Sequence, residues 1–184
     1  MSKSAWQLLG DYLKDTQLLG SIQSTLYWDQ NTSMPIAGST WRGEQLSLLA
    51  KQLHARQSSE EFECLIKEAK SELIYLKEND NLELRLLKDR FRNLELLEQD
   101  LKRQKSLDPK LVAELATAKS EGYMRWQEAK KNNDYKSFSP ALKNLISLRQ
   151  EQSIQLDEQR SCWETLAQPF EPNLTINRLR ELFE

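Results

Sequence analysis

Apolar residues recur at steps of three and four along almost the whole chain, and this spacing places them on one face of an α-helix. The first such stripe, between Ser4 and Asp29, contains Trp6, Leu9, Leu13, Leu19, Ile22 and Leu26. The 184 residues include only five glycines and five prolines, most of them where helices should begin or end. The pattern predicts an all-α array of about six or seven mostly antiparallel helices, with residues 1–184 forming a single all-helical region.

Residues that cap helices divide this pattern into segments. Ser, Thr and Asp side chains accept hydrogen bonds from the free N–H groups at the start of a helix, and proline is tolerated in its first turn. After the first helix, the expected N-caps are Ser39, Ser58 (with Glu61 as a capping box), Asp108, Ser139 and Thr175. A further helix is expected between the turn Asn79-Asp80-Asn81 and Leu101. The helix that starts at Ser139 is expected to be long enough to include Trp163.

One segment departs from these helix rules. The sequence Tyr27-Trp28-Asp29-Gln30-Asn31-Thr32-Ser33-Met34-Pro35 combines residues that weaken a helix with a proline that cannot simply continue one. Asp29 is placed to pair with Arg42 across this turn, and Gln30 to satisfy the backbone groups of the loop. Trp28 and Trp41 flank the turn, and we expect them to be buried there. The turn signature, defined as Trp28, Asp29, Gln30, Met34, Pro35 and Arg42, is predicted to join the first two helices; direct substrate contact is the alternative.

Residue counts argue against a self-contained active site. Hydrolytic zinc is normally held by three protein ligands, whereas the chain has one histidine, His54. We interpret His54 as an ordinary histidine on a helix face, and we predict no catalytic and no metal-binding residue in this chain. Acidic pairs are interpreted as solvated helix faces; they include Glu60 with Glu61, Glu95 with Glu98, and Glu181 with Glu184.

Charge and cysteine usage bound the partners and the compartment. The net charge is −2, and no basic face exists of the kind that phosphate binding needs, so we predict no nucleic-acid partner. Cys64 and Cys162 lie far apart and outside any Cys-x-x-Cys group, which indicates free thiols in a reducing, cytoplasmic compartment. Neither an apolar span of about 18 residues nor a leader pattern is found, so we predict no membrane contact and a soluble protein.

The turn segment, with Ala37-Gly38 and the helix start Arg42-Gly43-Glu44-Gln45-Leu46, resembles the N-terminal signature of the Taq-type thermostable zinc metallocarboxypeptidases. The likeness continues in the stretch Lys119–Tyr135, and again in Phe138–Leu142 and Phe170–Thr175. The resemblance implies a mostly helical, homodimeric protein with a deep cleft, in which zinc-activated water removes single residues from peptide C-termini. The His-Glu-x-x-His zinc helix of that family has no counterpart in these 184 residues.

The resemblance leads to a specific expectation for this chain. It is expected to be the N-terminal, cleft-wall region of a larger cleft-shaped metallopeptidase, truncated before the zinc-binding catalytic half and inactive alone. It then has no cofactor of its own; zinc or another divalent metal, the peptide substrate and homo-oligomer formation belong to the full-length enzyme. The last apolar stripe, Ile176, Leu179, Leu182 and Phe183, is expected to be left partly uncovered. The alternative is a stand-alone helical binding or scaffold module that offers an apolar groove to a partner helix.

Overall fold

The computed structural model describes residues 3–79 and 83–184, and the regular structure within them is helical. The elements are α1 (Ala5–Thr32), the 3-10 turn η1 (Ile36–Gly38), α2 (Ser39–Gln57), α3 (Glu60–Glu78), α4 (Leu84–Lys105), α5 (Pro109–Asn132), α6 (Tyr135–Leu156), α7 (Cys162–Ala167) and α8 (Ile176–Phe183). The predicted all-α array is confirmed. The turn expected at Asn79-Asp80-Asn81 falls largely outside the described residues.

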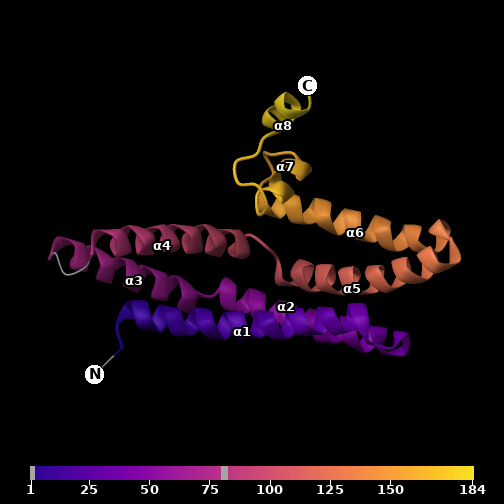
Figure 1. Ribbon diagram of the computed structural model, residues 1–184, viewed down its shortest axis with the longest axis horizontal. Helices are drawn as coiled ribbons and strands as arrows, with labels where there is room; N and C mark the ends of the chain where they lie inside the picture. Colours follow the sequence, from indigo (N-terminus) through magenta and orange to yellow (C-terminus); the bar gives the residue numbers. More distant parts are fainter. Residues whose placement is uncertain (1–2, 80–82) are drawn as a thin grey trace.

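The helices form stacked layers along an elongated body (Figure 1). α1 runs along the long axis, and α2 and α3 follow one another along it. The next layer consists of α4, which packs on α3, and α5, which packs on α2. α6 returns antiparallel over α5, and α7 and α8 rise away from these layers at the top of the view. The second half of the chain is therefore built mainly on α2 and α5.

Two groups of buried apolar residues hold these layers together. The first lies between α1, α3 and α4 and consists of Leu9, Tyr12, Phe62, Ile66, Ala69, Leu73, Leu87, Leu94 and Leu101. The second joins α5 to α6 and consists of Leu111, Leu115, Ala118 and Leu148. Full burial of one large aliphatic side chain contributes roughly 1.5–3 kcal/mol. Apolar residues three and four apart along α3 and α4 face this core, and Glu98 of α4 pairs with Lys70 of α3 at 2.7 Å.

The break between α2 and α3 lies one residue later than predicted. Ser59, and not Ser58, caps α3: its Oγ accepts a hydrogen bond from the N–H of Phe62 at 3.0 Å. Ser58 instead closes α2, since its hydroxyl donates to the carbonyl of His54 at 2.7 Å. The capping-box pattern favours Ser58, because Glu61 lies three residues after it, whereas Phe62 lies three residues after Ser59. Packing favours Ser59, because this register stacks Phe62 on the Tyr12 ring with centroids 5.4 Å apart.

Ser39 is likewise not a cap. It is the first residue of α2, and Gly38 occupies the N-cap position. The 3-10 turn over Ile36–Gly38 already gives the chain helical curvature, so no side-chain cap is needed to start α2. By contrast, the caps predicted at Asp108 and Thr175 are confirmed: Asp108 accepts from the N–H of Lys110 at 2.7 Å, and Thr175 from that of Arg178 at 3.2 Å.

α6 begins earlier and ends earlier than predicted. Asn133, in the left-handed conformation with φ 53°, turns the chain sharply after α5, so that Asp134 can cap α6 at once. Pro140 therefore lies inside the helix, where it removes one backbone hydrogen bond, and Ser139 is not the N-cap. At the other end, Asp157 is extended and accepts from the N–H of Gln159 at 3.0 Å. This turn ends α6 at Leu156 and leaves Trp163 in the separate helix α7.

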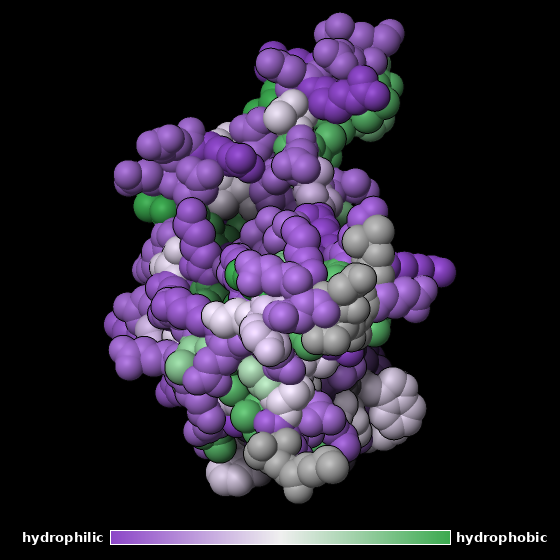
Figure 2. Space-filling view, turned by 90° about the vertical axis from the view of Figure 1, so that its left-hand side faces the viewer, coloured by the Kyte–Doolittle hydropathy of each residue, from purple (hydrophilic) through white to green (hydrophobic). Residues whose placement is uncertain are grey.

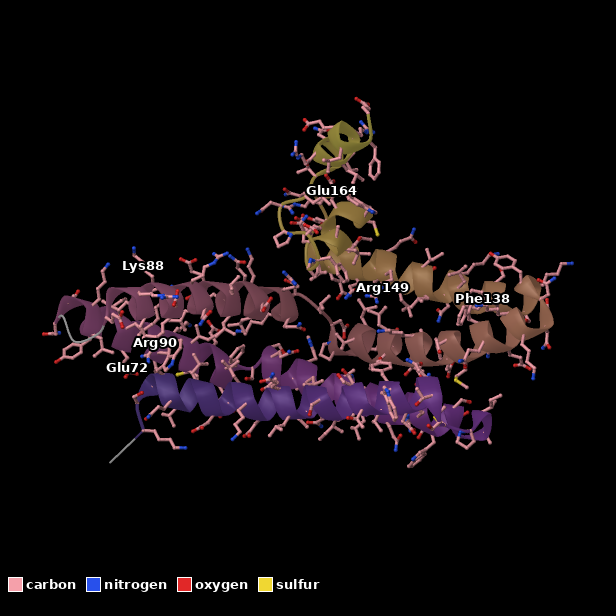
Figure 3. The ribbon with its side chains drawn as sticks, in the orientation of Figure 1. Glu72, Lys88, Arg90, Phe138, Arg149 and Glu164 are labelled. Atoms are coloured by element: carbon pink, nitrogen blue, oxygen red, sulfur yellow. The ribbon has the colours of Figure 1, made fainter. Side chains whose placement is uncertain are left out.

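The C-terminal segment carries exposed apolar residues. Polar residues cover most of the face shown in Figure 2, whereas hydrophobic residues gather on and beside the protruding end. Leu182 is 62% exposed and Phe183 84%, while Ile176 and Leu179 are half-buried. The expected exposure of this stripe is confirmed for its last two residues. Glu164, labelled in Figure 3, joins α7 to α8 by accepting from the N–H of Ile176 at 2.9 Å.

Candidate functional site

Arg42, in the first turns of α2, makes hydrogen bonds across the turn between α1 and α2. Its Nη2 donates to Asp29 Oδ2 at 2.5 Å, its Nη1 donates to the carbonyl of Leu26, and its Nε donates to Gln45 Oε1 at 3.0 Å. The residue is 9% exposed. A guanidinium can make these three bonds together because its N–H groups form a planar fork. The structure thus contains the ion pair between Asp29 and Arg42 that the sequence predicts, and the pair clamps the end of α1 to the start of α2.

The sequence predicts that Gln30 hydrogen-bonds to backbone groups of the loop. This prediction is wrong. The Gln30 side chain is buried and faces α5, where Nε2 donates to the carbonyl of Ser120 at 3.2 Å and Oε1 accepts from the Ser120 hydroxyl at 3.0 Å. The loop needs no help from Gln30, because the N–H groups of Ser33 and Met34 both donate to the carbonyl of Asp29 at 2.9 Å. A buried amide needs partners for both its donor and its acceptor, and Ser120 supplies both.

The two tryptophans of the turn are exposed, contrary to expectation. Trp28 is 65% exposed and Trp41 68%. Both belong to regular helices, and the faces that pack inward at this point belong to Gln30 and Arg42, so the indoles point outward. Met34 is half-buried and lies over Gly38, at which an added Cβ would stand 3.5 Å from the Met34 Cγ. Pro35, exposed and extended, separates α1 from η1.

Two concave regions adjoin one another beside this turn. A groove of about 1050 Å³ runs between α1, α2, α4, α5 and α6, and its lining includes Leu53, His54, Gln104, Val112, Arg149 and Gln152. A smaller pocket of about 540 Å³ lies between α1, α5 and α6 and is mainly apolar; its lining includes Tyr123, Trp126, Phe138, Leu142 and Leu145. Ser24, Tyr27 and Lys119 line both, so the two regions share one boundary.

Tyr27 is the half-buried residue at this boundary. The Lys119 Nζ lies over its ring, 4.9 Å from the centroid. Burial raises the pKa of the Tyr27 hydroxyl above its ordinary value, and the positive charge of Arg149 offsets part of this rise. The phenol is therefore protonated near neutral pH and can donate a hydrogen bond.

His54 is buried and lies between α2 and α4, with its Nδ1 3.2 Å from Gln104 Oε1. It is thus a packed residue and not one on an open helix face. Within residues 3–79 and 83–184, no group of three or more His, Cys, Asp and Glu side chains comes together in a way that could hold a metal ion. The residues that the structure describes therefore do not form a metal centre of the zinc-hydrolase type. In the same part of the chain, no helix is both long enough and apolar enough for a membrane crossing.

Comparison with known proteins identifies the family. The model of the carboxypeptidase Taq (M32) metallopeptidases matches residues 8–184. The chain belongs to this family. Thermostable carboxypeptidase 1 of Thermus thermophilus is 27% identical over 190 residues, which cover 98% of this chain and 36% of that protein. The chain spans about a third of the length of the curated relatives it matches.

Solved structures of M32 carboxypeptidases share the fold. The BsuCP crystal structure superposes with a TM-score of 0.83 at 24% identity, over 97% of this chain and 34% of that one. Trypanosoma cruzi metallocarboxypeptidase 1 gives a TM-score of 0.68 at 25% identity, with the same coverage. The all-helical architecture described above is therefore a part of the M32 fold.

The stretches that carry the family likeness meet in space. The turn segment contributes Gln30 and Tyr27, and the stretch Lys119–Tyr135 contributes Ser120 and Lys119, which contact them. Sequence reasoning missed this junction, although each stretch begins at one of its residues, Tyr27 and Lys119. Nothing in the sequence marks Arg149 of α6 as a site residue, because an exposed arginine on a helix belongs to no distinctive pattern.

Proposed function

We propose that this chain forms a helical wall of the substrate cleft in a metal-dependent carboxypeptidase that removes single residues from peptide C-termini. The family match over residues 8–184 is the observation that carries the proposal. The groove between α1, α2, α4, α5 and α6 supports it, because a peptide requires a concave surface of this kind. The Asp29–Arg42 pair and the Gln30–Ser120 pair then have a positioning role, since they hold the helices that line the groove.

The metal belongs, on this proposal, to the full-length enzyme. M32 proteins are metallopeptidases. The chain has one histidine, and it is buried against Gln104, so zinc or another divalent ion is held by residues other than these, and the 184-residue chain alone does not hydrolyse peptides. We further propose a cytoplasmic homo-oligomer, in which Cys64 and Cys162 remain thiols.

A chimera tests this proposal. The matching third of the Thermus thermophilus relative is replaced by this chain, and release of the C-terminal residue from a blocked dipeptide is measured with zinc present. We expect zinc-dependent release from the chimera, none after chelation, and none from the chain alone, which should also retain less than one equivalent of zinc after dialysis. A chimera that unfolds cooperatively but releases nothing contradicts the cleft-wall role and favours a stand-alone binding module.

A further inference from the structure

Lys119 and Arg149 bring two positive charges to the same groove from different helices. Lys119 stands on α5 at the boundary between groove and pocket, and Arg149 extends from α6 into the space between α6 and α5 (Figure 3). Tyr27, on α1, lines the same groove: the Lys119 Nζ lies over its ring, 4.9 Å from the centroid, and the positive charge of Arg149 acts on its hydroxyl. Three hydrogen-bond donors from three helices thus line the same groove, and two of them, Tyr27 and Lys119, also line the pocket.

Neither cation is neutralised by a carboxylate in the described part of the chain. The ion pairs found there involve other residues. Arg149 Nη1 donates to the neutral side chain of Gln152 at 2.7 Å, which fixes the guanidinium and leaves its remaining N–H groups for another acceptor. Asp100 also lines the groove, but it lies on α4 next to Arg103, at 3.9 Å. The two cations therefore give this groove a positive charge that attracts an anion.

The pocket next to these cations suits an apolar group. Its volume of about 540 Å³ exceeds what one aromatic side chain needs, and its lining is dominated by aromatic and leucine side chains. Trp126 and Tyr123 form one wall, with ring centroids 5.8 Å apart, and Phe138 reaches in from α6 (Figure 3). A ligand that joins an anionic group to a large apolar group would match both regions at once.

We propose that Tyr27, Lys119 and Arg149 bind the carboxylate of a ligand whose aromatic or large aliphatic group enters the adjoining pocket. A carboxylate has two oxygens, which can accept from the phenol, the ammonium and the guanidinium together. The binding is a property of this chain by itself. Its interpretation as recognition of a peptide, through a C-terminal or a side-chain carboxylate, rests on the proposed function.

The test is a titration of the 184-residue chain with N-acetyl-L-phenylalanine, followed by NMR. We expect a dissociation constant on the order of a millimolar, with shifts concentrated at Gly122 and the Trp126 indole. N-acetyl-L-phenylalaninamide, which lacks the charge, and N-acetylglycine, which lacks the apolar group, should each bind about tenfold more weakly. N-acetyl-glutamyl-phenylalaninamide distinguishes the carboxylate sources: binding as tight as the free acid assigns the site to acidic side chains, and weaker binding assigns it to chain termini.

Variants locate the site. Lys119→Gln and Arg149→Gln should each weaken binding of the acid about tenfold and leave binding of the amide unchanged. Lys143→Gln, which removes one charge from an exposed position of α6 outside both regions, is the matched control and should bind like the wild type. Arg149→Lys, which keeps the charge, should retain most of the affinity. Circular dichroism before each titration confirms that the variant is folded.

Three outcomes would overturn the proposal: equal binding of acid and amide, equal loss in Lys143→Gln, or no binding by the folded wild-type chain. These results are separable from those of the chimera. An active chimera with no binding of the acid removes this subsite and leaves the cleft-wall role intact. An inactive, folded chimera whose chain still binds the acid removes the peptidase role and leaves the carboxylate site.

Discussion

Replacing Arg42 with alanine should destabilise the turn between α1 and α2 more than replacing its partner Asp29. The Arg42 side chain is 10% exposed, so its three hydrogen bonds to Asp29, Leu26 and Gln45 are largely shielded from water. One hydrogen bond to a charged group contributes about 1.5–3 kcal/mol, but the Asp29 side chain is 39% exposed and its share is smaller. We expect Arg42→Ala to lower the free energy of unfolding by about 2–3 kcal/mol and Asp29→Ala by about 1 kcal/mol.

Urea unfolding of the two single variants and the double variant measures the coupling between them. We expect about 0.5–1.5 kcal/mol, because the remaining bonds of Arg42 survive the loss of Asp29. Arg178→Ala provides the matched control: it breaks a pair with Glu181 whose side chains are 63% and 64% exposed, and the change should stay within about 0.5 kcal/mol. Strict additivity of Arg42→Ala and Asp29→Ala would show that the ion pair does not hold this turn.

Three further outcomes are expected. Hydrogen bonds from Lys105 and a second lysine lower the pKa of Glu63 from 4.5 to about 2. The stabilising effect of these bonds is therefore complete above pH 4.5 and is lost as the pH falls towards 2. Glu63→Gln should flatten the melting-temperature profile between these pH values, and an unchanged profile would contradict the role of Glu63. Gln30→Ala should cost about 1–3 kcal/mol in urea unfolding, because it leaves the Ser120 hydroxyl buried without its acceptor; Ser120→Ala in that background should then cost little more, and full additivity would argue against the pair. The exposed end of α8 should make the isolated chain self-associate in sedimentation velocity, and Phe183→Ser should shift it towards monomer; a clean wild-type monomer at high concentration counts against this.

Features governed by local chemistry were predictable from the sequence. The stripes of α3 and α4, the caps Asp108 and Thr175, and the contact between Asp29 and Arg42 all depend on residues close together in the chain. The start of α6 was missed for a local reason as well: Asp134 and Ser139 both qualify as caps, and the left-handed turn at Asn133 gives the first of them the advantage.

The candidate site was harder to predict because it is assembled over long distances. The partner of Gln30 lies 90 residues away, and no local rule distinguishes a glutamine that serves its own loop from one that serves another helix. The position of the two tryptophans beside the turn predicts burial, but side-chain direction on the helix decides their exposure. Lys119 and Arg149 are ordinary surface cations until α5 and α6 bring them to one groove.

The bond between Gln30 and Ser120 also sets an order of events while the chain is being made. At about 5–20 residues per second, the 90 residues between the two partners take roughly 5–18 s to synthesise. Arg42 is synthesised much sooner, so its hydrogen bonds across the turn can form while the amide of Gln30 is still exposed to water. The C-terminal half of α1 can therefore dock against α5 only after the turn to α2 has formed, and a nascent chain stalled before Ser120 would leave the side chain of Gln30 without its partner.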